Sequence, residues 1–212
     1  MFVHVRHPEP AEIIPGMTDM QRPIAPHAIG LAKAKAEELC RNYGPFILII
    51  SSLFKRADDH ATIIANAHDL VFPDHARPTI LRTRLMNERN HGHIFGLSSE
   101  EAHRLYPEFY AAKCIENEFE IYFPGSDECF WDLIGRISHL NESILEQFLT
   151  RGNVCASGHW GTCYGFLMVR AKFTKAELLE LIKTETFPAF CEVVPFTQEA
   201  IDSLRSRIGA HA

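Results

Sequence analysis

A short run of large apolar residues, Phe46-Ile47-Leu48-Ile49-Ile50, restricts the possible folds of this chain more than any other segment. An unbroken run of β-branched and aromatic residues of this length predicts a strand that is covered on both faces, as the inner strands of parallel sheets are. The run is far shorter than the roughly 20 apolar residues that a membrane-spanning helix needs. The rest of the chain must therefore supply helices for both sides of a sheet.

Strand and helix patterns alternate along most of the chain. We expect strands at residues 2–6, 46–50, 79–84, 154–157 and 190–196, and helices at residues 26–43, 56–68, 98–107, 128–150, 162–172, 174–183 and 198–208. This alternation predicts an α/β fold: a three-layer sandwich with a mostly parallel sheet and helices on both faces. The length of 212 residues suits a single domain, residues 1–212. Residues 89–126 break the alternation, and we interpret them as a lid-like insertion over the carboxyl edge of the sheet.

Charge and cysteine content exclude several classes of protein. The formal net charge of -6, from 27 acidic and 21 basic residues, argues against a nucleic-acid binder, which needs an excess of cations to neutralise phosphates. The six cysteines form no CxxC pair, which disfavours a zinc ribbon or a thioredoxin-like motif. No signal peptide or membrane span is visible, so we expect a cytoplasmic protein with reduced thiols and no membrane partner. The 12 histidines are a surplus that needs an explanation.

Three of the expected strands end in polar groups that suit a phosphate. The first runs into Arg6-His7, the second into Ser51-Ser52 with Arg56 shortly after, and the fourth into Ser157-Gly158-His159. In open α/β sheets ligands bind beyond the carboxyl ends of the strands, so these groups should meet at one edge. Arginine binds phosphoryl oxygens with two parallel hydrogen bonds, and a neutral imidazole is a competent nucleophile near pH 7.

The same residues carry a resemblance to the histidine phosphatase superfamily. Val5–Glu9 resembles its Arg-His-Gly-Glu signature, Ser51–Ala57 its Ser-Ser-Pro-Leu-x-Arg-Ala motif, and Met86–Gly92 the Leu-Asn-Glu-Arg-x-x-Gly segment of cofactor-dependent phosphoglycerate mutases. Weaker likenesses are Pro23–Ile29, which is similar to the Pro-Leu-Thr-x-x-Gly segment, and Gly125–Arg136, which is similar to the Pro-Gly-Gly-Glu-Ser stretch. His159 falls where the second core histidine belongs. The motifs run in collinear order from residue 3 to about residue 170, and they imply a phosphoglycerate mutase-like fold.

The resemblance implies a role for each matched residue. His7 would be the nucleophile that is transiently phosphorylated, and Arg6, Arg56 and His159 would bind the phosphoryl oxygens. Glu88 would protonate the leaving oxygen and then activate water. No metal and no cofactor is implied. Phe54, Arg89 and Trp160 are expected to border the pocket for the organic part of the substrate, while His60 and His91 are candidates for its rim.

Four positions depart from the family pattern. Pro8 replaces a glycine, Ile13 stands where phosphoglycerate mutases carry a phosphate-binding asparagine, His60 replaces a threonine, and Trp160 replaces a glycine. None of these changes removes a core catalytic group. Together they predict a modified substrate pocket.

The charges of the insertion favour a phosphatase over a mutase. A mutase must hold a second phosphate, yet residues 94–126 offer only Arg104 and Lys113 as cations. Six glutamates of the same segment (100, 101, 108, 116, 118 and 120) oppose them, and such a segment repels a second anion. Arg89 keeps phosphoglycerate mutase-type transfer open as an alternative.

Two further classes remain as alternatives. A metal-dependent hydrolase would use the histidines, but His91-Gly92-His93 is their only close pair and no HExxH motif accompanies it. A phosphate-binding module without turnover would normally lack the nucleophile or the acid, and both are present here. The expected ligand is a small phosphate ester, with sugar phosphates, nucleotides and phosphoproteins all open, and the chain is expected to be a monomer or a homodimer.

Overall fold

The computed structural model describes residues 1–14, 16–184 and 188–209, and its centre is a five-stranded sheet. The strands are β1 (Phe2–Arg6), β2 (Phe46–Ser51), β3 (Thr79–Arg82), β4 (Asn153–Gly158) and β5 (Val193–Pro195), in the order β3-β2-β4-β1-β5. Strands β1 to β4 run parallel, whereas β5 pairs antiparallel with β1. The expected mixed α/β architecture with a mostly parallel sheet is confirmed.

One face of the sheet is covered by α1 (Ile29–Tyr43) and α2 (Lys55–Val71). Their inner faces are rich in alanine, so the two helices lie close to each other and to β1, β2 and β4 around Ala36, Leu39, Ala61 and Ile64. The pattern of small residues at helical spacing is what predicts these helices. In place of one continuous helix from residue 26, a 3₁₀ turn (Pro26–Ala28) precedes α1.

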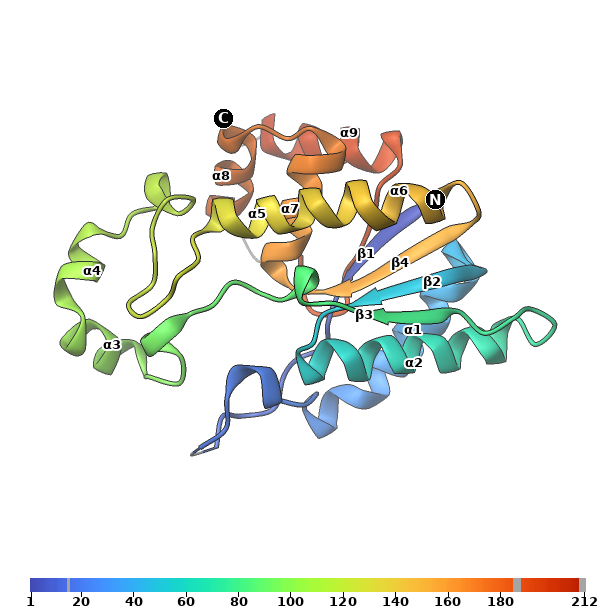
Figure 1. Cartoon of the computed structure of the whole chain (residues 1–212), viewed down its shortest axis with the longest axis horizontal. Coiled ribbons are helices and arrows are strands. Elements are labelled where there is room, and N and C mark those ends of the chain that lie inside the picture. The colour runs from blue at the N-terminus through green and yellow to red at the C-terminus, as the bar shows by residue number, and fades with distance from the viewer. Residues whose placement is uncertain (15, 185–187, 210–212) are drawn as a thin grey trace.

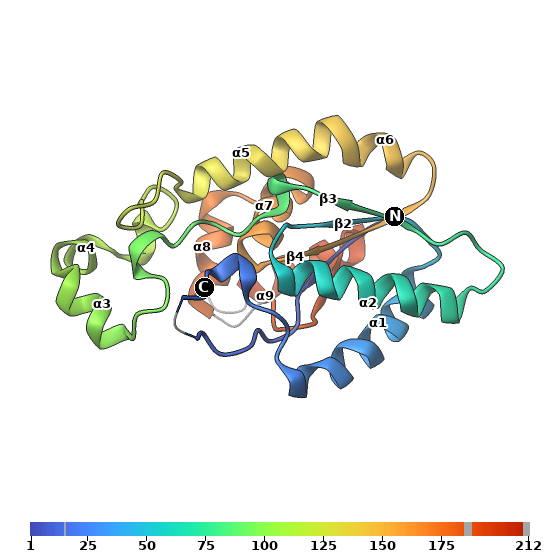
Figure 2. The same ribbon diagram turned by 60° about the horizontal axis from the view of Figure 1, so that its bottom comes forward.

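The opposite face is covered by α5 (Phe130–Leu140), α6 (Glu146–Leu149) and α7 (Trp160–Ala171). A π-helical turn, Asn141–Leu145, joins α5 to α6, so the long helix expected over residues 128–150 is present with one irregular turn. Helices α8 (Lys175–Thr184) and α9 (Gln198–Gly209) pack against α7 and β5. Figure 2 shows the sheet between the α1–α2 layer and the α5–α6 layer.

The segment between β3 and α5 holds two short helices, α3 (Ser99–Leu105) and α4 (Pro107–Ala112). The capping box between Ser98 and Glu101 begins α3 as the sequence predicts, and α3 ends just before Pro107. Helix α4, in which Pro107 occupies the first helical position, is not predicted by the sequence pattern. In Figures 1 and 2 this segment extends from the side of the sheet toward which the parallel strands run.

Two other boundaries differ from expectation. Helix α7 begins at Trp160, directly after β4, and not at Thr162. Strand β5 is limited to Val193–Pro195, because a residue with positive φ, Cys191, turns the chain before it. Within the described residues, no helix is long and apolar enough to cross a membrane.

Candidate active site

The polar residues at the carboxyl ends of β1, β2 and β4 lie side by side. In the sheet register Arg6 faces Gly158 and Ser51 faces Ser157, and the His7 amide donates a hydrogen bond to the Gly158 carbonyl at 2.9 Å. The imidazoles that follow β1 and β4, those of His7 and His159, consequently lie with ring centroids 4.9 Å apart. The two histidines that the sequence places 152 positions apart are therefore neighbours.

The His7 ring has one nitrogen that carries no proton. Its Nδ1 lies 2.5 Å from the Pro8 carbonyl oxygen, which can only accept, so Nδ1 carries the proton and Nε2 keeps its lone pair. Nε2 accepts a hydrogen bond from Arg56 Nε at 3.0 Å. Burial, followed by the cations of Arg56 and Arg6, lowers the pKa of His7 well below its usual value. His7 is thus a neutral imidazole of fixed orientation.

His159 lies at the start of α7, held from three sides. Its Nε2 is 2.7 Å from Ser52 Oγ, its amide donates to Thr162 Oγ1 at 2.8 Å, and the Phe54 ring stands edge-on against it at 4.9 Å. Its Nδ1 is buried without a hydrogen-bond partner among the described residues. Burial, followed by the proximity of His7 and Arg56, lowers the pKa of His159 well below its usual value. An anion bound here would offset these causes and favour the protonated ring.

The two arginines approach His7 from different elements. Arg56, in the first turn of α2, is only 5% exposed and reaches His7 directly. Arg6, at the end of β1, donates to the Pro188 carbonyl at 2.6 Å and lies over the Phe190 ring at 4.2 Å. Burial lowers the pKa of Arg6, and Glu88 opposes that shift. Both guanidiniums remain charged at neutral pH and create a positive field around the His7 ring.

Glu88 reaches the same site from the loop after β3. One carboxylate oxygen accepts from the Gly161 amide at 3.0 Å and the other from the Arg89 amide at 2.9 Å. A Cβ added at Gly161 would overlap Glu88 Oε1. Glycine at position 161 is therefore what lets the carboxylate rest against the N-terminal turn of α7.

We expect Gly161→Ala to lower kcat by about 10-fold to 100-fold, because the new methyl group would displace Glu88, the residue expected to act as general acid and base. Such catalysis contributes about 10²–10⁴ in enzymes generally. Steady-state kinetics on a phosphate ester measures the effect. Gly135→Ala in α5 is the matched control, since a Cβ there meets nothing within 4 Å. That control should keep full activity and gain up to about 1 kcal/mol of stability from helix propensity. Unchanged kcat in Gly161→Ala would contradict the placement of Glu88.

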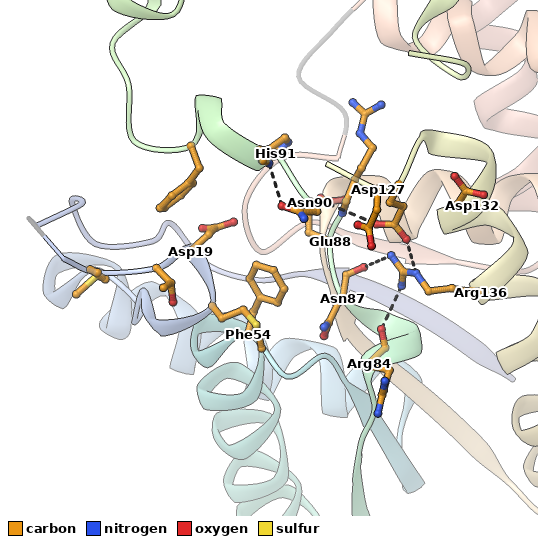
Figure 3. Close-up of a pocket in the computed structure, with 17 residues that line it drawn as sticks. Asp19, Phe54, Arg84, Asn87, Glu88, Asn90, His91, Asp127, Asp132 and Arg136 are labelled. Atoms are coloured by element: carbon orange, nitrogen blue, oxygen red, sulfur yellow. Dashed lines mark hydrogen bonds and ion pairs between the residues drawn. The ribbon is translucent and has the colours of Figure 1, made fainter. Parts of the chain in front are cut away.

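Two adjoining cavities open at this edge. The smaller, of about 490 Å³, is bordered by Arg6, His7, Arg56, Glu88 and Trp160. The larger, of about 890 Å³, is shown in Figure 3, where Asp19, Phe54, Asn87, Glu88 and Asp127 surround it. Asp19, Glu88, Arg89, His91 and Phe95 border both cavities, so they form one continuous recess.

The three residues expected at the substrate pocket all border this recess, but they differ in the contacts that they make. Phe54 borders the larger cavity and packs on His159. Trp160 borders the smaller one and packs on Tyr164, at 4.4 Å between ring centroids. Arg89 is 5% exposed and forms a buried ion pair with Glu118, so its charge is already neutralised.

Of the two histidines expected at the rim, only one lies there, and an aspartate without a sequence expectation lies beside Arg56. His91 borders the recess, as expected of a rim residue. The expectation for His60 is wrong, because His60 is 1% exposed beneath the sheet edge and contacts Ser157 Oγ at 3.2 Å. Asp19, which pairs with Arg56, belongs to no motif that the sequence offers.

Buried neutral histidines make the stability of the fold depend on pH. Burial lowers the pKa of His4 and of His60 to about 3. Between that value and the ordinary value of about 6.5 the unfolded chain binds more protons than the folded one, so stability falls as pH falls. Each ring contributes about 1.4 kcal/mol per pH unit in this window, and nothing above it.

We therefore expect urea unfolding between pH 6 and pH 4 to show a free energy of unfolding that decreases steeply with pH. His60→Phe should reduce that slope by about 1.4 kcal/mol per pH unit, since one of the buried imidazoles is gone. The slope is compared between the two proteins, so a lower absolute stability of the variant does not matter. Equal slopes would contradict a neutral, buried His60.

Among the described residues, no group of three or more His, Cys, Asp or Glu side chains is arranged to hold a metal ion. The titratable groups around His7 are instead the imidazole pair, two guanidiniums and the carboxylates of Glu88 and Asp19. This set can present a nucleophile, bind an anion and move a proton.

Similar folds are found among solved phosphatase structures. The mycobacterial glucosyl-3-phosphoglycerate phosphatase is 17% identical with a TM-score of 0.68, and the match covers 85% of this chain and 83% of that one. A phosphoserine phosphatase from Entamoeba histolytica is 18% identical with a TM-score of 0.63, covering 91% and 87%. A putative alpha-ribazole-5'-P phosphatase from Escherichia coli is 18% identical with a TM-score of 0.60, covering 81% and 77%. At these identities the likeness establishes the fold.

Comparison with curated protein sequences gives no significant match. The family model of the histidine phosphatase superfamily, branch 1, in contrast matches residues 3–189. That range includes the residues of the recess from Arg6 to Trp160. Phe190, which also borders the smaller cavity, lies just beyond it. The chain belongs to branch 1 of the histidine phosphatase superfamily.

Proposed function

We propose that this protein is a metal-independent phosphomonoester hydrolase that acts through phosphorylated His7. The observation that carries the proposal is the fixed His7 ring, with Nδ1–H bound to a backbone carbonyl and the Nε2 lone pair facing Arg56 in the recess. Family membership and the phosphatase folds of its structural neighbours support the same reaction class.

In the first step, His7 Nε2 attacks the phosphorus atom and the bond to the ester oxygen breaks. Glu88 in its protonated form gives its proton to the departing oxygen, which leaves as an alcohol. Arg6, Arg56 and His159 stabilise the charge on the three remaining oxygens. In the second step, Glu88 takes a proton from water as the water attacks phospho-His7, and inorganic phosphate leaves.

The cations around the recess support hydrolysis over phosphoglycerate mutase-type transfer. A mutase has to hold a second phosphate, but Arg89 is paired with Glu118 and Lys113 lies 3.7 Å from the same glutamate. Arg136, on the larger cavity, is bound to Glu128 at 2.6 Å. Glu118 and Glu128 therefore offset two of these three positive charges, and the exposed Asp127 adds a further carboxylate at the cavity border.

The segment 89–126 would act as a lid-like insertion for this reaction. Near its start, His91, Phe95 and Gly96 border the smaller cavity, which His7 also borders. Phe119 and Phe123 are buried and fasten the segment, while Arg89 lies over the Phe123 ring at 4.3 Å. We expect this part of the chain to exclude water and to contact the organic part of the ester.

The test is a panel of phosphate esters assayed in the presence of a chelator such as EDTA. We expect hydrolysis of at least one class of ester with unchanged rate when the chelator is added. Loss of activity with the chelator would instead favour a metal-dependent hydrolase. Tight binding of phosphate without any turnover on the panel would favour a binding module.

Trp160→Gly is expected to change which esters are preferred, because it removes an aromatic wall from the smaller cavity. The kcat/KM for esters with large apolar alcohols should fall about 10-fold relative to small esters, a usual value for a lost apolar contact. The matched control is Trp131→Gly, which removes the other tryptophan. Trp131 also lies in the first turn of a helix, but it borders neither cavity. An unchanged order of preference in Trp160→Gly would rule out its role.

A further inference from the structure

Arg56, one of the two arginines proposed to bind the phosphoryl group, is already paired with a carboxylate of the protein. The partner is Asp19, which lies in a 3₁₀ turn, Asp19–Gln21, of the loop between β1 and α1. Thr18 and Gln21 fix this turn through a hydrogen bond of 3.0 Å from the Thr18 amide to the Gln21 side chain. Figure 3 shows Asp19 on this loop, at the side of the recess where Phe54 lies.

The contact between the two residues uses most of the guanidinium. Nη1 of Arg56 donates to Asp19 Oδ1 and to the Asp19 carbonyl, both at 2.7 Å, and Nη2 donates to Oδ2 at 3.1 Å. Nε donates to His7. A guanidinium has five N–H groups. Within the described part of the chain, four of them are thus engaged.

A phosphoryl group on His7 would need the same donors. Arginine binds phosphate best with two parallel N–H groups, and here both terminal nitrogens face the carboxylate. The side chains are 6% and 18% exposed, so little water is present to weaken the ion pair. Arg56 therefore cannot bind a phosphoryl group with both nitrogens unless Asp19 gives them up.

We propose that Asp19 is a specificity-determining residue that competes with the phosphoryl group for Arg56. The inference rests on the proposed function. When Arg56 releases Asp19, the Asp19 carboxylate keeps a neighbouring cation, because Arg22 lies 3.6 Å from Asp19 Oδ1. Arg22 is held in place by a hydrogen bond of 2.9 Å to the Ala11 carbonyl. A dianionic phosphomonoester is a stronger competitor than an anion of single charge, such as a phosphodiester, so the contact selects for monoesters.

The test compares the binding of inorganic phosphate to three forms of the full chain by titration calorimetry at neutral pH. Asp19→Asn removes the charge and keeps the shape, and we expect its phosphate dissociation constant to be about 10-fold lower than that of the wild type. The matched control is Asp69→Asn. Asp69 lies on α2, and its carboxylate forms an exposed ion pair with Arg77 of the following loop. That control should bind phosphate like the wild type.

Weaker phosphate binding in Asp19→Asn overturns the proposal, since Asp19 would then hold Arg56 in place for the ligand. Equal binding overturns it as well, since Arg56 would then not exchange partners. In the ester assay, competition predicts a lower KM in Asp19→Asn, whereas a positioning role predicts a lower kcat. If the wild type hydrolyses esters but binding is unaffected by Asp19→Asn, only this inference fails. If no form binds phosphate or hydrolyses any ester, the proposed function fails.

Discussion

His7→Ala is expected to lower kcat/KM for any phosphomonoester substrate by at least about 10³-fold, equivalent to about 4 kcal/mol of transition-state stabilisation. The reason is that the proposed nucleophile would be lost, while Arg6, Arg56 and His159 would still be able to bind the phosphoryl group. The measurement is steady-state hydrolysis with a chelator present, together with acid and alkaline quenches of enzyme mixed with a labelled ester. A label stable to alkali and lost in acid marks phosphohistidine and should appear only when His7 is present.

The matched control is His139→Ala, which removes an exposed histidine near the end of α5 that borders neither cavity. It should retain wild-type rates and a full phosphohistidine signal. Undiminished hydrolysis in His7→Ala would refute the mechanism, and an alkali-stable label in that variant would show that another nitrogen is the nucleophile.

Glu88→Gln is expected to lower kcat for esters of ordinary alcohols by about 10²-fold to 10⁴-fold, because an amide cannot give or take the proton. The loss should depend on the leaving group. An ester of a strongly acidic phenol needs no proton on its departing oxygen, so its first step should stay fast and phospho-His7 should accumulate. Rapid-quench kinetics with p-nitrophenyl phosphate separates the two steps.

For this second prediction, Glu100→Gln in α3 is a suitable control, since Glu100 is exposed in the insertion. A first step that stays fast for both good and poor leaving groups would mean that Glu88 acts only in the hydrolysis of the phosphoenzyme. No loss for either would remove Glu88 from the mechanism.

The main elements of the fold could be predicted from periodicity, and the exceptions have specific causes. Helix α4 is not predicted, because the pattern around Pro107 indicates the end of the preceding helix. Proline is equally suited to the first position of a new helix, which is where Pro107 lies. The direction of β5 could not be predicted, because hydrophobic periodicity indicates that a strand forms but not whether it runs parallel or antiparallel to its neighbour. Its antiparallel pairing follows from the turn at Cys191 and from the free edge of β1.

The positions of His60 and Arg56 could also be predicted from the sequence. His60 is three residues from Ala57 and one from Ala61, so helical spacing already places it on the buried face of α2, away from the recess. Its neighbour in the motif, Arg56, lies in the first turn of that helix, and only the end of a helix reaches the carboxyl edge of the sheet.

The sequence by itself determined that His7, Arg56 and His159 meet, because parallel strands bring the residues that follow them to one edge. It did not determine which charges remain available there. The tertiary structure decided that Arg89 is paired with Glu118, 29 residues away, and that Asp19 holds Arg56. Such pairs depend on the paths of the loop after β1 and of the insertion, which local propensity does not specify. The electrostatics of the recess is therefore a property of the folded chain, whereas the identity of its central residues is a property of the strand order.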